Sequence, residues 1–130
     1  MIDRLYEKIG GSTTINELVQ LFYDRVLADP RLGPFFPHTD MATLRARQAM
    51  FMTMLLGGAH SFNGRDLATA HSGARAQGLN DAHFDALLEH FEASLHELEV
   101  AEDYIREIVA LLEATRHAVL GRSIAPTTGP

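Results

Sequence analysis

Apolar residues recur at helical spacing in several long segments of this chain, and this periodicity constrains its fold more than any other feature. The most regular segment is 15–27, where the apolar positions follow the i, i+3, i+4, i+7 pattern. We expect this helix to end near Asp29, because Pro30 pushes the residue before it out of the helical region. The stripe consists of Ile15, Leu18, Val19, Phe22, Tyr23, Val26 and Leu27.

A second long helix is predicted after Asp40, whose side chain is suited to cap a helix N-terminus. Its apolar stripe is interrupted by Gln48. After Gly57 and Gly58 the chain reverses, and a short helical piece presents His71. Two such faces, brought together, would form an apolar slot with a ligand-binding nitrogen on one wall and a hydrogen-bond donor on the other. The two faces consist of Met41, Leu44, Gln48, Phe51, Met52 and Leu55, and of Leu67, His71 and Ala74.

Local signals mark where other elements start and stop. Residues 2–9 favour a short first helix that stops at the glycine pair 10–11. Thr14 and Glu17 fit a capping box for the helix that follows. Residues 30–39 contain three prolines and one glycine, which predicts a tight corner rather than a long element.

Two long helices are expected in the C-terminal half. Asn80 or Asp81 can cap the first, whose apolar face covers residues 84–98. The second spans residues 102–120 and ends at Gly121. Since the chain contains no strand-like alternation, no internal repeat and no linker, the sequence predicts an all-α fold.

Size and composition narrow the class of protein. The 130 residues suffice for one domain, which we expect to span residues 1–121, followed by a flexible tail of residues 122–130. The formal net charge of -6 argues against nucleic acid or an anionic membrane surface as a partner. The absence of cysteine excludes disulfides, thiolate nucleophiles and zinc–thiolate sites. We see no signal peptide and no apolar run that could span a bilayer, so we expect a cytoplasmic protein.

Three polar residues on apolar faces are candidates for a site. A buried Tyr23 hydroxyl needs a partner, and the ordinary interpretation is a core tyrosine bonded to a backbone carbonyl. Gln48 is unusual in the centre of an apolar stripe, although a structural hydrogen bond would also explain it. A single histidine on an apolar face, such as His71, is most often an ordinary core residue. Two hydrogen-bond donors on separate stripes, Tyr23 and Gln48, favour a shared pocket.

Other chemistry leaves few signals in this sequence. It contains no His-Glu-x-x-His motif, no glycine-rich phosphate loop and no Gly-x-Ser-x-Gly elbow. A di-iron helical bundle would need Glu-x-x-His pairs on two helices. The pairs Glu92 with His96 and Glu113 with His117 are each four residues apart, so this helical metal-binding bundle is a weak alternative that stays open.

A series of short motifs follows one order and spacing along the chain. The motifs are Leu5-Tyr6-Glu7-Lys8-Ile9-Gly10-Gly11, Phe22-Tyr23-Asp24-Arg25-Val26-Leu27-Ala28-Asp29, Phe35-Phe36, Asp40-Met41, Gln48, Leu56-Gly57-Gly58, Gly64-Arg65, Ala70-His71 and Gly78-Leu79. Together they resemble the group I truncated haemoglobins, the short two-over-two helical globins of bacteria, protists and algae. The resemblance covers residues 5–120 and implies a truncated globin-like two-over-two helical sandwich that binds haem.

Carried over residue by residue, the resemblance makes His71 the proximal ligand of the haem iron. It makes Tyr23 and Gln48 the distal pair that donates hydrogen bonds to a bound diatomic ligand and would serve any catalysis. Leu44 occupies the position of the distal histidine in many globins, so the sixth site would be free of that residue. Arg47 stands where some relatives carry a ligating histidine or lysine. A guanidinium is a poor ligand, so we expect Arg47 to meet a haem propionate.

The resemblance assigns haem contacts to further residues. Phe36 would pack on the haem face at the helical corner. His117 stands where some cyanobacterial and algal relatives carry a histidine that bonds to a haem vinyl group. The expected cofactor is therefore haem b, with a covalent link at His117 left open. The other expected contacts are Phe35, Phe51, Phe62, Leu67, Leu79 and Phe84.

The resemblance also implies a function. The protein is expected to bind O2, NO and CO, and tight O2 binding favours the oxidation of NO to nitrate. Nitric oxide dioxygenase activity would require an electron donor, which the sequence does not identify. The alternatives are an O2 store or ligand sensor without turnover, and the non-haem helical bundle. We expect a monomer or a weak dimer.

Overall fold

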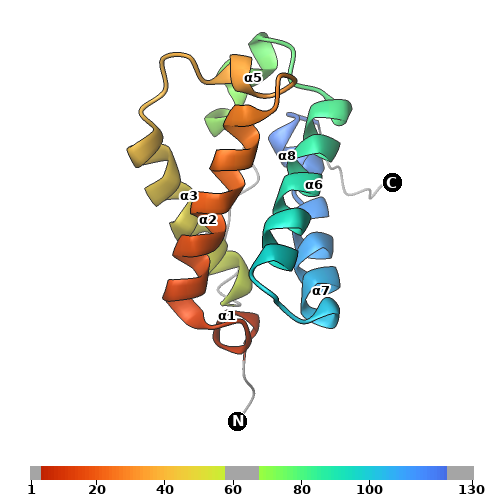
Figure 1. Cartoon of the computed structure of the whole chain (residues 1–130). Helices are drawn as coiled ribbons and strands as arrows, with labels where there is room; N and C mark the ends of the chain where they lie inside the picture. Colours follow the sequence, from red (N-terminus) through yellow and green to blue (C-terminus); the bar gives the residue numbers. More distant parts are fainter. Residues whose placement is uncertain (1–3, 58–67, 123–130) are drawn as a thin grey trace, which may run out of the picture.

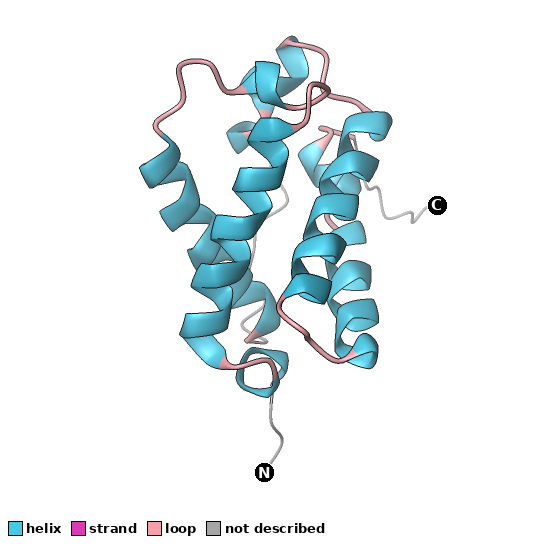
Figure 2. Cartoon of the chain, in the orientation of Figure 1, coloured by secondary structure: helices cyan, strands magenta, loops and turns pink. Residues whose placement is uncertain are grey.

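The computed structural model describes residues 4–57 and 68–122 (Figure 1). All regular elements in these two ranges are helices, which confirms the all-α prediction (Figure 2). No described helix is long and apolar enough to cross a membrane. In chain order the elements are α1 (Leu5–Lys8), α2 (Gly11–Ala28), the 3-10 helix η1 (Gly33–Phe35), α3 (Met41–Leu56), α5 (Ser72–Ala76), α6 (Asp81–Glu97), α7 (Glu102–Glu113) and α8 (Arg116–Val119).

Two pairs of helices form the two layers of the fold (Figure 1). α2 packs against α3 in one layer and α6 packs against α7 in the other, while α2 also contacts α6 between the layers. The apolar stripes predicted from the sequence face the space between these helices, where burial of apolar surface stabilises the fold. Among the most completely buried core side chains are Ile15, Leu18, Val26, Met52, Leu95, Ile105 and Ile108.

Three predicted helix boundaries are confirmed. Asp40 caps α3, and its carboxylate accepts hydrogen bonds from the backbone amides of Ala42 and Thr43 at 3.1 and 3.3 Å. Asn80 caps α6 in the same way. Gly121 follows α8 with a φ of 72°, a left-handed conformation that favours glycine and ends the helix.

α1 is shorter than the predicted helix of residues 2–9. Arg4 has an extended backbone (φ −84°, ψ 160°), so the first helical residue is Leu5. The Glu7 carboxylate accepts a hydrogen bond from the Arg4 backbone amide at 3.0 Å, which stabilises this start. Residues 2–3 lie outside the described ranges.

The predicted capping box at the start of α2 is wrong. The helix begins at Gly11, so Thr14 and Glu17 already lie inside it. Gly10 precedes the helix with a φ of 118°, and a Cβ at this position would clash with the Thr14 hydroxyl oxygen. Because glycine tolerates this conformation, α2 can begin at Gly11, three residues before Thr14.

The single helix predicted for residues 102–120 is also wrong, because the structure breaks it between α7 and α8. Thr115 lies at the break and is buried. Its hydroxyl and its backbone amide both donate to the Leu112 carbonyl, at 2.7 and 3.0 Å. A buried threonine hydroxyl that bonds the preceding turn competes with the regular helical hydrogen bonds, and the helix restarts at Arg116.

Candidate functional site

A cavity of about 580 Å³ opens between the helices and receives side chains from α2, α3, the segment around α5, α6 and the junction of α7 with α8. This volume lies within the range of cofactor and small-molecule sites. Its lining is mainly aromatic and aliphatic. The polar or charged side chains among the lining residues are Tyr23, Thr39, Arg47, Gln48, His71 and Thr115.

Ten of the predicted site residues line this one cavity. They are Tyr23, Phe35, Phe36, Leu44, Arg47, Gln48, Phe51, His71, Leu79 and Phe84. Phe62 and Leu67 lie outside the described ranges. His117 is an exposed residue of α8 and is not among the residues that line the cavity, although its neighbours in the chain, Thr115 and Val119, are.

Tyr23 enters the cavity from α2, where the apolar stripe of that helix meets the pocket. Its ring makes edge contacts with Phe22 and Phe36, at centroid distances of 4.8 and 6.3 Å. Burial raises the pKa of Tyr23 well above its ordinary value, and the smaller effect of the nearby Arg45 charge lowers it. The phenol therefore keeps its proton at neutral pH and can act as a hydrogen-bond donor.

α3 supplies a second wall of the cavity. Met52 is fully buried in the core, whereas Leu44, Gln48 and Phe51 are half-buried and line the cavity. The predicted stripe is therefore divided between the helical core and the pocket. Arg47, one residue before Gln48, also lines the cavity and is exposed, which leaves its charge in contact with water.

His71 approaches the cavity from a third direction. The sequence pattern predicts this histidine within a helix, but the structure places it at a break between helical residues 68–70 and α5, with φ −105° and ψ 9°. Its carbonyl accepts a hydrogen bond from the Arg75 backbone amide at 3.0 Å. Ala70 and Ala74 line the cavity beside it, and their small side chains leave room for a group to approach the imidazole.

The corner between α2 and α3, which brings two phenylalanines to the cavity, is held in place by contacts of the Asp29 carboxylate. α2 ends at Ala28, as predicted, and Asp29 is buried just beyond it. The Asp29 carboxylate accepts hydrogen bonds from the Arg31 backbone amide at 2.8 Å and from its guanidinium at 2.7 Å, and lies 2.7 Å from Nε2 of His90 on α6. The hydrogen bonds from Arg31, followed by the contact with His90, hold the pKa of Asp29 well below its usual range. This contact ties the corner, and with it η1, to α6.

Several lining residues were not predicted as site residues. Phe22 and Phe91 stack with ring centroids 3.8 Å apart, and the sequence pattern indicates only that both lie on apolar helical faces. Thr115 gives no signal in the sequence, because its burial depends on the break between α7 and α8. The additional lining residues are Phe22, Leu32, Thr39, Met54, Ala70, Ala74, Leu87, Leu88, Phe91, Leu112, Thr115 and Val119.

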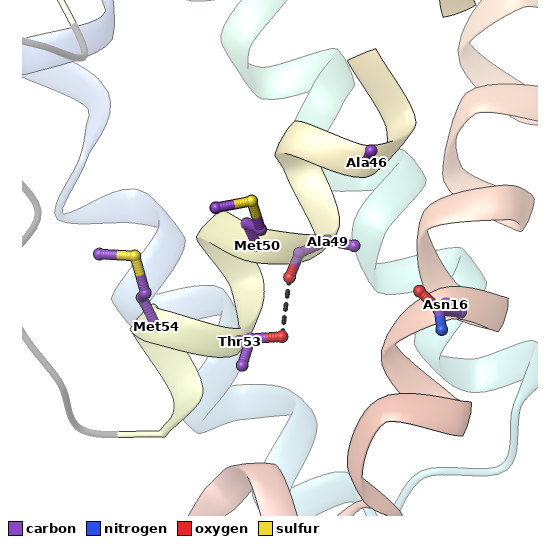
Figure 3. Close-up of a pocket in the computed structure, with 6 residues that line it drawn as sticks. All are labelled: Asn16, Ala46, Ala49, Met50, Thr53 and Met54. Atoms are coloured by element: carbon purple, nitrogen blue, oxygen red, sulfur yellow. Dashed lines mark hydrogen bonds between the residues drawn. The ribbon is translucent and has the colours of Figure 1, made fainter. Parts of the chain in front are cut away.

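A second, more open hollow of about 420 Å³ lies between α2 and α3 (Figure 3). Asn16 faces it from α2, and the remaining lining residues belong to α3. The Thr53 hydroxyl donates to the Ala49 carbonyl at 2.8 Å and so is engaged within its own helix. None of the lining residues is titratable, so this hollow offers little chemistry. They are Asn16, Ala46, Ala49, Met50, Thr53 and Met54.

Within the described ranges, no three histidine, aspartate or glutamate side chains are grouped so that they could hold a metal ion. Glu113 instead pairs with Arg116 at 2.6 Å. Glu92 and His96 face each other at 3.9 Å, with both side chains about half exposed. The described residues therefore give no support to the helical metal-binding bundle.

Comparisons with known proteins agree with this architecture. The family model of the bacterial-like globins matches residues 4–121. A group 1 truncated haemoglobin of Tetrahymena pyriformis is 42% identical over 118 residues, which are 91% of this chain and 95% of the relative. One of Synechocystis is 44% identical over 114 residues, covering 87% of this chain and 92% of the relative.

Solved structures lead to the same result. The 2/2 haemoglobin of Synechococcus sp. PCC 7002, in the cyanomet state and with covalently attached haem, has a TM-score of 0.85 and 41% identity. That comparison covers 92% of this chain and all of the other. The Fe(III) truncated haemoglobin of Tetrahymena pyriformis has a TM-score of 0.80 and 41% identity, with 91% and 98% covered. The chain therefore belongs to the bacterial-like globins and, among them, to the group 1 truncated haemoglobins.

Membership of this family implies a haem that binds small diatomic ligands such as O2. The residues of this chain fit that cofactor. The cavity is large enough for an organic cofactor, its lining is mainly apolar, and a single imidazole, that of His71, reaches it among the lining residues. Two side chains that can donate hydrogen bonds, Tyr23 and Gln48, reach the same cavity from α2 and α3.

Proposed function

We propose that the cavity binds haem b, that His71 would supply a nitrogen ligand to the iron, and that Tyr23 and Gln48 would hydrogen-bond a bound diatomic ligand. The observation that supports this proposal is that these three residues come from separate elements to one otherwise apolar cavity. The haem iron, when bound, would supply the coordination site for O2, NO or CO and the change of oxidation state. The protein would bind the haem, orient the diatomic ligand and exclude water.

The first task of the protein would be to supply one nitrogen ligand to the iron and no second ligand that competes with the diatomic molecule. A neutral imidazole is a good ligand for haem iron. Leu44 lines the cavity on the α3 side and cannot coordinate a metal. Arg47 stays protonated in proteins, so it is suited to pair with a propionate rather than to bind iron.

The second task is to hold the diatomic ligand. The buried Tyr23 phenol remains protonated and can donate, and the Gln48 amide is a second donor. Each hydrogen bond to a charged acceptor contributes roughly 1.5–3 kcal/mol. Because about 1.4 kcal/mol corresponds to a factor of ten, two such bonds would slow the escape of O2 by roughly a hundredfold or more.

Slow release makes a protein a poor O2 carrier and favours reaction of the retained O2. We therefore propose nitric oxide dioxygenase activity, in which O2 and NO combine to nitrate with one electron supplied by a separate donor for each turnover. The apolar side chains of Phe36, Leu44 and Phe51 would keep water away from the reacting ligands. We also propose that this takes place in the cytoplasm.

The covalent link at His117 remains a hypothesis within this proposal. The haem of the related Synechococcus haemoglobin is covalently attached. In this chain His117 lies on α8, two residues from Thr115 and two from Val119, which line the cavity. Extraction of the holoprotein with acidified ketone tests the link, since haem that passes completely into the organic layer is not bonded to the protein.

The proposal is tested by reconstituting the full chain with haem and recording absorption spectra of the reduced protein before and after CO. We expect a sharp Soret band that shifts with CO, and NO consumption in the presence of O2 and a reductant. His71→Ala should abolish the normal ferrous spectrum, whereas the control His96→Ala changes an exposed histidine and should not. Failure of the chain to take up stoichiometric haem would refute the proposal.

A further inference from the structure

Among the described residues, the segment that carries His71 lies outside the principal packing of helix on helix. The helix is broken at His71, and α5 takes no part in the principal contacts among the described helices. A residue in such a segment needs another restraint if its side chain is to keep a fixed direction. Within the described ranges, the side chain of Arg75 is a candidate for this restraint.

The Arg75 guanidinium connects three parts of the chain. Its Nη1 donates to the carbonyl of Ala68 at 2.6 Å and to the carbonyl of Val119 at 3.0 Å. Ala68 lies three residues before His71, and Val119 is the last residue of α8. The Arg75 backbone amide bonds the His71 carbonyl at 3.0 Å. Arg75 thus holds the chain on both sides of the histidine and ties it to α8.

Gly121 forms the other side of this contact. A Cβ built on Gly121 would lie 2.7 Å from Nε and 2.8 Å from Cζ of Arg75. The guanidinium therefore packs directly on the backbone after α8, and a side chain at position 121 would displace it from this position. The φ of 72° at Gly121 independently favours glycine, so the turn and the close approach use the same residue.

We propose that Arg75 is a positioning residue for His71, which it holds against the end of α8; this inference rests on the proposed role of His71 as the haem ligand. Arg75 makes no ion pair within the described part of the chain, and its guanidinium instead donates hydrogen bonds to the Ala68 and Val119 carbonyls. An arginine suits this position because its planar guanidinium presents several fixed donors, whereas a lysine ammonium is a single flexible point charge.

The contacts of the Arg75 side chain with Ala68, Val119 and Gly121 form a clamp, which can be tested without haem. We would measure amide hydrogen exchange by mass spectrometry on the full chain as purified, comparing the wild type with Arg75→Ala and Gly121→Ala. Both variants should speed exchange in residues 68–76 about tenfold or more, with little change in α2. Arg106→Ala is the control, since Arg106 is an exposed arginine of α7. Unchanged exchange in residues 68–76, or a uniform increase along the chain, would overturn the proposal.

The effect on the ligand is tested with the haem-loaded protein. Arg75→Ala should broaden or shift the iron–imidazole stretching band of the ferrous protein and speed haem loss to an excess of acceptor apoprotein by about tenfold. In a His71→Ala background the same substitution should leave haem loss nearly unchanged. An equal effect of Arg75→Ala in both backgrounds would mean that it supports the fold in general, and would refute a positioning role.

These measurements separate the two levels of the argument. If His71→Ala alone alters neither the spectrum nor the rate of haem loss, the ligand assignment fails, while the exchange data still decide whether the clamp exists. If His71 proves to be the ligand but Arg75→Lys preserves both the band and the rate, the geometric requirement for arginine is wrong.

Discussion

The Tyr23 hydroxyl is a single group whose removal tests the distal half of the proposed site. Replacement by phenylalanine deletes one oxygen and keeps the ring. The edge contacts with Phe22 and Phe36, at 4.8 and 6.3 Å, depend on the ring alone and should persist. Since the side chain is only 5% exposed, water cannot readily replace the lost donor. The variant therefore changes the chemistry of the pocket more than its packing.

The size of the expected effect follows from the strength of the hydrogen bond that is lost. A hydrogen bond to a charged acceptor contributes roughly 1.5–3 kcal/mol, which corresponds to a change of about 10- to 150-fold in rate. We expect Tyr23→Phe to accelerate O2 dissociation by at least tenfold. CO accumulates less charge when bound, so its dissociation should change much less.

Stopped-flow displacement of O2 by excess CO measures the first rate directly. Tyr104→Phe is the matched control, because Tyr104 is a half-buried tyrosine of α7 whose ring lies beneath the Lys8 ammonium. An O2 dissociation rate that is the same in Tyr23→Phe and the wild type would refute the distal assignment. So would an equal acceleration of O2 and CO release, since it would indicate a wider exit rather than a lost hydrogen bond.

Three further predictions concern the stability of the fold. Asp29→Asn should lower the Tm at pH 7, because the folded state holds the pKa of this carboxyl below its unfolded value. The stability that the wild-type carboxylate contributes is present above its unfolded pKa of about 4 and is lost as the pH falls below that value. Thermal melts from pH 7 to pH 2 should therefore show a weaker acid dependence in the variant than in the wild type. Asp40→Ala should lower the Tm by a few degrees through loss of the α3 cap, while Asp103→Ala at an exposed position should not, and a similar Tm for both variants would contradict the capping role. Gly10→Ala should lower the free energy of unfolding in urea by about 1–3 kcal/mol, because it forces a positive φ on alanine and a clash with Thr14. An unchanged free energy of unfolding would contradict the requirement for glycine at the start of α2.

The sequence by itself determined the helices and most of their ends. The stripe of residues 15–27, the Asp40 and Asn80 caps and the stop at Gly121 all depend on neighbours within a few residues, so they could be predicted locally. Its motifs also led to the truncated globins by resemblance, and that prediction is confirmed. Local signals failed at Thr14, where the sequence predicts a helix cap. The chain instead turns at Gly10, and the helix begins at Gly11.

The resemblance assigned three polar groups to one site, but only the tertiary structure shows from the residues themselves that they share a cavity. Tyr23, Gln48 and His71 are far apart in the chain, and periodicity could say that each lay on an apolar face but not that these faces meet. The same holds for the break at Thr115, the contact of Asp29 with α6 and the bonds from Arg75 to α8. Each depends on burial or on a partner more distant in sequence than a helical turn, and such contacts are fixed only when the layers pack together.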